Sequence, residues 1–336
     1  MYDLRSDTFT KPTEAMRKAM YSAEVGDDVY GEDPTVERLQ RMAEEITGKE
    51  RSLVVSSGCM GNLIPLMIKG GKGMEVLTSG YSHIVNHEIG AVSSLGGTLP
   101  VIIPSDHGIM KADEIAKHIH GYAYDMSESA IIETENTTSG IVYPIDELRS
   151  IRKLADSNNL WVHMDGARIF NASVETGISV REYADTASDI TFCLSKGLGC
   201  PAFSVLSGDK DFIEKAKRLR KLLGGGMRQI GILAAAGIYA LENNVARLRD
   251  DHEHRAAISE ALARTGWADI EISATNMIFF RSDRDMDSIV AAFRRKGVLF
   301  LKEGDMGRIV LSLNISDEDT REIVRIIEGM DPKEFV

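Results

Sequence analysis

The sequence predicts an α/β fold in which a large domain with a mainly parallel sheet is followed by a smaller C-terminal α+β domain. Three observations lead to this prediction. The chain has 336 residues, which is long for a single hydrophobic core. Short apolar runs alternate with amphipathic helical patterns from about residue 53 to residue 207, as expected of βαβ units. Strict alternation then stops, so we expect residues 1–245 to form the large domain and residues 246–336 the small one.

Composition places the chain among ordinary globular proteins. Hydrophobic residues make up 43% and charged residues 27%, and the formal net charge is -12. We expect no nucleic acid and no membrane as partner, because no basic stretch offsets the general repulsion. No segment has the length of a membrane span and the N-terminus lacks a signal-peptide pattern, so a cytoplasmic location is predicted. The three cysteines lack zinc spacing, and their odd number argues against a disulfide framework.

The elements of the large domain follow in order. Pro12 and Thr13 start a helix, and Asp33 caps a second helix that begins at Pro34 and ends at Gly48. A third helix follows Gly58 and should be kinked or delayed by Pro65. Strands are expected at 53–55, 74–78, 98–103, 129–133, 160–165, 189–194 and 202–207. Further helices are expected at 82–95, 145–157, 210–223 and 230–241.

The last third of the chain changes pattern. A charged helix over about 244–264 connects to the small domain. Strands are predicted near residue 270 and at 277–280, 298–301 and 308–313, with helices at 286–296 and 317–329. Since strands and helices no longer alternate strictly, this part is expected to be α+β.

The stretch from Leu160 to Gly199 carries the most chemistry. Asp165 and Arg168 follow one apolar strand and Lys196 follows the next, so all three should project from the carboxyl edge of the sheet, where ligands bind. The amine can form a Schiff base, the carboxylate can keep a pyridine nitrogen protonated, and the guanidinium can neutralise an anion, which suits pyridoxal 5'-phosphate (PLP). Taken singly, a Ser-Lys-Gly segment is more often a strand end and an aspartate more often a cap.

Two other segments leave alternatives open. The turn at Ser57 and Gly58 places a helix N-terminus after a strand, which is either a phosphate site or an ordinary turn. His83 and His87 are four residues apart and could share a helical face as a metal pair. A metal site needs a third ligand, and spacing supplies none, so no metal is predicted.

Several ordered motifs resemble the low-specificity L-threonine aldolases. They are Arg5–Thr8, Gly26–Pro34, Ser57–Gly58, Met60–Asn62, Asp165–Asn171, Phe192–Leu198 and Gly224–Gln229. The resemblance runs from the first residues to about Leu241 and continues more thinly to the C-terminus. It implies the aspartate-aminotransferase-like PLP fold, fold type I. It also implies a homotetramer with active sites at dimer interfaces.

The resemblance assigns roles residue by residue. Lys196 is the Schiff-base lysine, Asp165 pairs with the pyridine nitrogen and His83 stacks on the ring. Gly58 and Cys59 match the phosphate turn, although Cys59 stands where the family commonly has threonine or serine. The substrate carboxylate is held by Ser6, Arg168 and Arg308, and Arg168 also lies at the cofactor. Tyr30, toward the substrate, and Arg228, toward the cofactor, match positions that serve a neighbouring subunit's site.

The activity implied is cleavage of L-threonine or L-allo-threonine, or a related β-hydroxy-α-amino acid, to glycine and an aldehyde through a Schiff base at Lys196. The alternatives are a β-eliminating lyase or racemase on the same scaffold, and a non-catalytic binding protein. The intact Lys196, Asp165 and Arg168 argue against the last. Thr138 stands where the family usually has histidine, so we hypothesise that His87 partly takes over as base for the substrate hydroxyl, with His83 or water as competitor.

Overall fold

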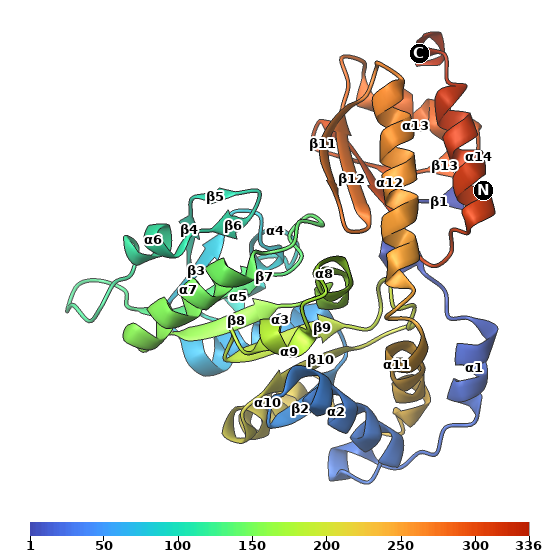
Figure 1. The fold of residues 1–336 in the computed structure, drawn as a ribbon. Helices are drawn as coiled ribbons and strands as arrows, with labels where there is room; N and C mark the ends of the chain where they lie inside the picture. The colour runs from blue at the N-terminus through green and yellow to red at the C-terminus, as the bar shows by residue number, and fades with distance from the viewer. Residues whose placement is uncertain (336) are drawn as a thin grey trace.

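A seven-stranded sheet forms the centre of the larger part of the computed structural model, which describes residues 1–335 (Figure 1). Its strand order is β2-β10-β9-β8-β7-β3-β4. Only β10 runs against the others, so the carboxyl ends of the remaining strands meet at one edge. The strands are β2 (Arg51–Val55), β3 (Glu75–Ser79), β4 (Leu99–Ile103), β7 (Ser129–Glu135), β8 (Trp161–Asp165), β9 (Asp189–Cys193) and β10 (Ser204–Gly208).

Helices cover both faces of this sheet because its strands are apolar on both sides. Along β2, Leu53 and Val55 belong to one core with α3 and α10, whereas Val54 belongs to the larger core on the opposite face. Besides two short helices between β3 and β4, the helices of the larger part are α1 (Glu14–Tyr21), α2 (Pro34–Thr47), α3 (Gly58–Pro65), α6 (Ala112–Ala116), α7 (Ile145–Ser157), α8 (Ile169–Thr176), α9 (Val180–Ala184), α10 (Lys210–Leu222) and α11 (Gly231–Asn243). Two short strands, β5 (Ser105–Asp106) and β6 (Ile109–Met110), form a hairpin beside them.

The predicted helix boundaries are largely confirmed, with one error. Asp33 caps α2 and Gly48 ends it at a φ of 71°. Pro65 ends α3, and a π-helical turn continues to Gly70. The single helix expected over 82–95 is wrong. It is split into α4 (His83–Asn86) and α5 (Ala91–Ser94), because Ile89 and Gly90 take φ values of 55° and 67°, which no α-helix tolerates.

The smaller part has its own sheet and its own core. Antiparallel strands β11 (Asp269–Ala274), β12 (Met277–Arg281), β15 (Met306–Val310) and β14 (Leu301–Glu303) lie in that order. Helices α12 (Leu248–Arg264), α13 (Met286–Arg295) and α14 (Asp317–Glu328) belong to the same part, and a short helical turn follows at Pro332–Glu334. Trp267 packs edge-on against Phe280 and Phe293 in its core.

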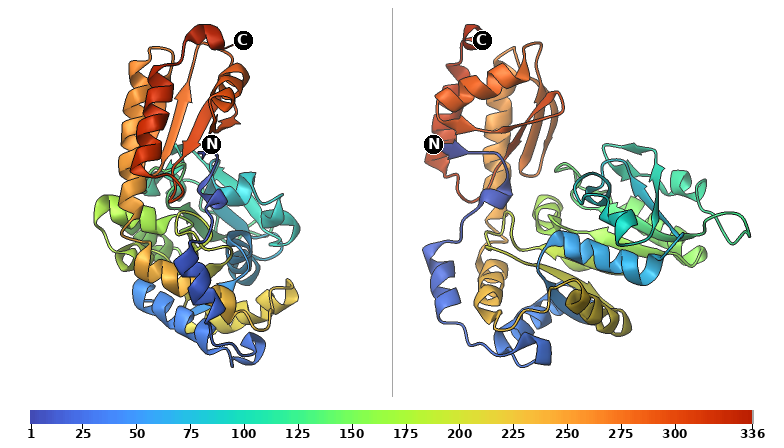
Figure 2. Two further views of the ribbon diagram at one scale, coloured as in Figure 1. Left: turned by 90° about the vertical axis from the view of Figure 1, so that its right-hand side faces the viewer. Right: turned by 180° about the vertical axis from the view of Figure 1, so that it is seen from behind.

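The N-terminal arm crosses from the larger part to the smaller one (Figure 2). Strand β1 (Tyr2–Asp3) pairs in parallel with β13 (Val298–Leu299), and Leu4 is fully buried in the smaller core. The larger core extends to Leu248 and the smaller one begins again at Ile258, so α12 takes part in both. The exact division at residue 245 stays a prediction.

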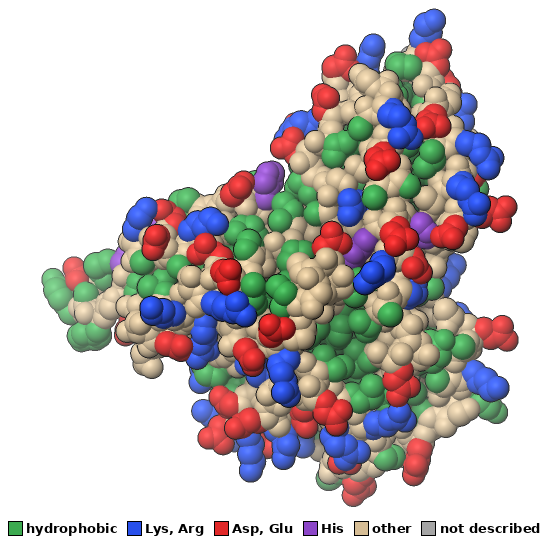
Figure 3. Space-filling model, viewed as in Figure 1, with side chains coloured by type: hydrophobic (Ala, Val, Ile, Leu, Met, Phe, Trp, Pro, Cys, Tyr) green, Lys and Arg blue, Asp and Glu red, His purple; other side chains and the backbone are tan. Residues whose placement is uncertain are grey.

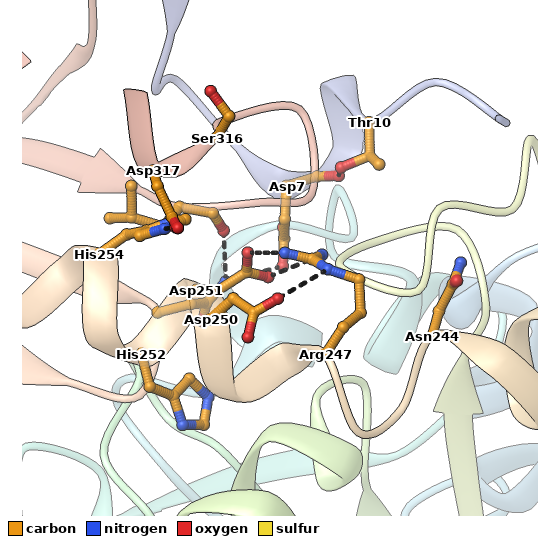
Figure 4. A network of polar contacts seen from close by, with 12 residues as sticks. Asp7, Thr10, Asn244, Arg247, Asp250, Asp251, His252, His254, Ser316 and Asp317 are labelled. Atoms are coloured by element: carbon orange, nitrogen blue, oxygen red, sulfur yellow. Dashed lines mark hydrogen bonds and ion pairs between the residues drawn. The ribbon is translucent and has the colours of Figure 1, made fainter. Parts of the chain in front are cut away.

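Ionic contacts fix the connector helix α12 (Figure 4). Arg247 donates to Asp251 at 2.6 Å one turn later. His254 bonds Asp317 at 2.8 Å and joins α12 to the start of α14. Burial raises the pKa of Asp251 to about 6, against the opposing effect of Arg247. These contacts fix the first turn of α12 and hold α12 against the start of α14.

The surface is charged but mixed. On the face drawn in Figure 3, Lys and Arg side chains are interspersed with Asp and Glu. Within residues 1–335, no helix is both long and apolar enough to cross a lipid bilayer.

Helix α3 approaches β9 closely at Gly61, and this contact yields a stability prediction. A Cβ at Gly61 would lie 2.5 Å from Thr191 Cγ2. Gly61→Ala should lower the free energy of unfolding by about 1–2 kcal/mol, because overpacking outweighs the better helix propensity of alanine. Urea unfolding measures it. Gly121→Ala is the control, since a Cβ there meets nothing within 4 Å. Equal stability of the two variants would contradict the packing argument.

Candidate active site

A cavity of about 660 Å³ lies between the carboxyl edge of the large sheet, the N-terminal arm and the small sheet. All three regions contribute to its walls, which explains why no continuous stretch of sequence describes it. It is lined by Ser6, Thr8, Gly80, Tyr81, His83, Asn86, His87, Glu135, Ser139, Arg168, Lys196, Met277, Phe279, Glu303 and Arg308. Six of the sequence-predicted site residues are therefore brought together here: Ser6, His83, His87, Arg168, Lys196 and Arg308.

Lys196 projects into this cavity from the turn after β9. Its backbone carbonyl accepts from Gly199 N at 2.8 Å, which closes the turn. Among the described residues, its amine has no hydrogen-bond or ion-pair partner. Burial acts to raise the pKa of Asp7 and of Glu135, and the nearby charge of Lys196 acts in the opposite direction on both. An amine held in this way is available for covalent chemistry with a carbonyl compound.

Asp165 is the last residue of β8 and is only 3% exposed. Its Oδ1 accepts from Ala167 N at 2.9 Å, and its Oδ2 accepts from Asn62 Nδ2 at 2.7 Å. Asn62 comes from α3, the helix whose N-terminal turn contains Gly58 and Cys59. The charges of Asp165 and Glu88 act on the Cys59 thiol, whose pKa is raised to about 11 by burial first and by these charges second. The turn at Gly58 and Cys59 and the carboxylate of Asp165 are thus neighbours.

His83 is oriented by carboxylates. Its backbone N–H donates to Glu135 at 2.8 Å, and its ring Nδ1 lies 2.8 Å from Glu88 Oε1. The His87 ring lies 5.4 Å from that of His83 and is exposed to the cavity. Cys59, His83 and Glu88 offer ligand atoms within 4.8 Å of one another, so the fold, and not sequence spacing, supplies the companions of His83. His87 is not among them.

Two guanidinium groups face the cavity, one tightly and one loosely paired with a carboxylate. Arg168 is bound in a bidentate manner by Asp7, at 2.8 Å and 2.7 Å. Arg308 has a single looser contact, 3.4 Å to Glu303. Burial and then the charge of Arg168 lower the pKa of Arg308. Two cations that repel each other across a cavity favour a bound anion such as a carboxylate.

Two carboxyl groups close to Asp165, those of Glu133 and Glu135, have raised pKa values. Burial, and then the charge of Asp165, raise the pKa of Glu133 to about 7. Burial and the charges of Asp165 and Glu133 raise the pKa of Glu135 well above its ordinary value. Of the two, Glu135 lines the cavity and Glu133 does not.

Tyr30 and Arg228 lie outside this cavity. Arg228 pairs with Asp27 at 3.0 Å, its guanidinium lies 5.9 Å from the centre of the Tyr30 ring, and Tyr30 is 73% exposed. Both side chains therefore lie on the surface. Tyr30 belongs to the segment between α1 and α2, and Arg228 is bound to that segment through Asp27.

Thr138, at the position where the family usually has histidine, is not among the residues that line the cavity. Its side chain is buried and its hydroxyl donates to the His107 carbonyl at 3.3 Å. A Cβ at Gly108 would lie 2.3 Å from the Thr138 Oγ1 atom, so Thr138 packs closely against the hairpin.

The sequence reasoning missed several polar residues of the site. Asn62 was noted only as part of a motif, and Glu88, Glu135 and Asp7 were given no role. The available signal was their position: Glu135 ends a buried strand that already contains Glu133, and Asn62 lies in a mostly apolar helix. Buried polar groups of this kind require partners, and such partners concentrate at functional sites.

The residues present fit PLP. An unpaired lysine, a buried carboxylate, a histidine fixed beside them and a helix N-terminus with Gly58 provide what the Schiff base, the pyridine nitrogen, the ring face and the phosphate need. The carboxylate of Asp165 has only one hydrogen bond on each oxygen, so further acceptor capacity remains.

Comparison with known proteins agrees with this geometry. Residues 3–284 match the beta-eliminating lyase family. The low specificity L-threonine aldolase of Escherichia coli K12 is 40% identical over 324 residues, which are 96% of this chain and 97% of the relative. The Leishmania major threonine aldolase shares the fold with a TM-score of 0.85 at 20% identity, over 98% of this chain and 99% of that one. A serine palmitoyltransferase from S. paucimobilis with bound PLP has a TM-score of 0.74 at 16% identity, over 97% and 86% of the two chains. The chain therefore belongs to the beta-eliminating lyase family and, within it, to the low-specificity L-threonine aldolases.

Proposed function

We propose that this protein is a PLP-dependent aldehyde-lyase that cleaves L-threonine and L-allo-threonine to glycine and acetaldehyde. The observation that carries the proposal is the convergence of Lys196, His83, Arg168 and Arg308 on one cavity, with Asp165 buried beside it. When bound, PLP supplies an electron sink for the pair released as the Cα–Cβ bond breaks. The side chains of this chain then have to bind, orient and move protons.

The substrate carboxylate is bound by the two guanidinium groups. Arg168 is held rigidly by Asp7, so it offers a fixed direction for an incoming oxygen. Arg308 approaches from the small sheet, and Ser6 from the arm. Asp165 holds a proton on the pyridine nitrogen, and Lys196 attaches the cofactor through its aldehyde carbon.

His83 is placed to accept the proton of the substrate hydroxyl. Its Nδ1 faces a carboxylate oxygen of Glu88 and must donate to it, because a carboxylate only accepts. In the neutral ring the Nε2 atom is then the acceptor. His87 is the second candidate base, because it lines the same cavity beside His83. Detection of glycine and acetaldehyde from threonine tests the reaction. Loss of the α-proton without aldehyde would point to the lyase or racemase alternative.

We further propose that the protein is a homotetramer and that Tyr30 and Arg228 serve the cavity of a neighbouring copy. Their exposure on one surface, away from their own cavity, supports this. Light scattering after gel filtration measures the assembly. The cytoplasmic location stays a prediction.

Lys196 should carry the cofactor. The purified protein should be yellow, and borohydride should fix the cofactor covalently to the peptide that contains Lys196. Lys196→Ala should lose both the label and turnover, because no other amine lines the cavity among the described residues. Peptide mass analysis identifies the labelled lysine. A label on another lysine would refute the assignment.

Arg308 should contribute to binding of the substrate carboxylate. Arg308→Gln should raise the KM for threonine by about 10- to 100-fold, the loss of one charged hydrogen bond. The KM for threonine in steady-state kinetics gives the effect. Arg281→Gln is the control on the neighbouring strand, since Arg281 is 44% exposed and pairs with surface acids. Equal KM values for the two variants would remove Arg308 from the site.

His87 should influence the choice between diastereomers. His87→Phe should lower turnover and alter the ratio of activities on L-threonine and L-allo-threonine, if the His87 ring shares the proton with His83. Kinetics on both substrates measure this. Thr138→His should not restore activity to this variant, because position 138 is buried against the hairpin. An unchanged ratio in His87→Phe would leave His87 a structural residue.

A further inference from the structure

A buried chain of polar side chains runs beneath the cavity. His163 Nδ1 lies 2.6 Å from Asp189 Oδ2, and His163 Nε2 lies 3.2 Å from Asn62 Oδ1. The amide nitrogen of Asn62 reaches Asp165 at 2.7 Å and Glu88 at 3.0 Å. His163 and Asp189 are 0% exposed and Asn62 is 1% exposed, so water does not compete for these contacts. His163 itself is not among the residues that line the cavity.

The hydrogen-bond partners of Asn62 and His163 permit only one placement of the amide and ring hydrogens. The Asn62 nitrogen faces two carboxylates and donates one hydrogen to each. A flipped amide would turn its carbonyl oxygen toward both carboxylates and be repelled. The Asn62 oxygen therefore faces His163 Nε2 and accepts from it.

His163 must then donate from both ring nitrogens. One faces the carboxylate of Asp189 and the other the carbonyl of Asn62, and neither partner can donate. A ring that donates twice is an imidazolium. Burial opposes the charge, but Asp189, Glu133 and Asp165 together raise the pKa of His163 above its ordinary value.

We propose that His163 is a positioning residue that acts through Asn62: by donating to the amide oxygen it aims both amide hydrogens at Asp165 and Glu88. The first fixes the direction of the Asp165 carboxylate for the pyridine nitrogen, and the second holds Glu88 where it fixes the His83 ring at 2.8 Å. One buried histidine thus positions two residues that the proposed function places at the cofactor, Asp165 and His83. This inference rests on the proposed function, because it assumes PLP at Asp165.

The test compares His163→Gln and Asn62→Ala with the parent. The first substitution keeps a donor at position 163 but removes the charge, and the second cuts the connection. His254→Gln is the matched control, because His254 is also a buried histidine bonded to an aspartate, at 2.8 Å, but has no contact with Asn62. Titration of cofactor-stripped enzyme with PLP gives the dissociation constant. The absorption spectrum and steady-state kinetics are then recorded on the reloaded holoenzyme.

Both variants should weaken PLP binding and lower kcat by about 10-fold or more, with the KM for threonine within about twofold of the parent. The absorption of bound PLP should shift in the same direction as in an Asp165→Asn variant recorded alongside, whereas His254→Gln should match the parent. In the double variant, His163→Gln should add nothing to the effect of Asn62→Ala on PLP affinity, because the two act along one path.

Parent-like PLP affinity and spectrum in His163→Gln would overturn the proposal, as would additive effects in the double variant. If His163→Gln does not fold, parent-like affinity and spectrum in Asn62→Ala overturn it alone. These outcomes would contradict the role of His163 but not the proposed function, provided that the parent produces acetaldehyde from threonine. A parent that binds no PLP at Lys196 refutes the proposed function instead.

Discussion

A single buried carboxylate, that of Asp7, holds three parts of the chain together at the cavity. Asp7 lies in the N-terminal arm, accepts twice from Arg168 of the larger part and once, at 3.3 Å, from Asn276 of the smaller part. Burial opposes its ionisation, but Arg168 and then Lys196 bring its pKa below the ordinary value. Because the folded pKa lies below the unfolded one, the stability from this pair is present at neutral pH and is lost as the pH falls through the lowered folded pKa. The position of Ser6, the direction of Arg168 and the distance to Arg308 all depend on this junction.

Much of the fold could be predicted because local patterns and the global architecture agree. Caps such as Asp33 and Gly48 marked helix ends, and apolar runs marked strands whose carboxyl ends had to meet. That rule alone placed Asp165 and Lys196 at the same edge. The prediction failed where local signals were weak. A β-branched residue rarely takes a positive φ, so the sequence did not predict that the helix over 82–95 breaks at Ile89. The hairpin that buries Thr138 was equally invisible, because its contacts join residues distant in sequence.

The polar interior of the site could not be derived from the sequence for a related reason. Asn62, Glu88 and His163 come from different elements, and each would be an ordinary surface residue in another setting. Their roles can be inferred only from the hydrogen-bond partners that each finds in the folded structure, because a buried polar group must bond to the neighbours that the fold provides. The same limit applies to the roles proposed for Tyr30 and Arg228, which require a second chain.

The pairing of β1 with β13 joins the first residues of the chain to the last forty or so, at about the longest separation this topology allows. During synthesis the N-terminal arm emerges first, yet its partner strand and Asn276 emerge among the last. The sheet that bears Asp165 and Lys196 is complete well before then. The arm must therefore wait, unpaired, until the smaller part has folded, and only then can Asp7 orient Arg168. The cavity therefore closes only after the smaller part has folded, and a ribosome-bound fragment that lacks β13 to β15 would contain Lys196 and Arg168 but neither the pairing partner of β1 nor Arg308.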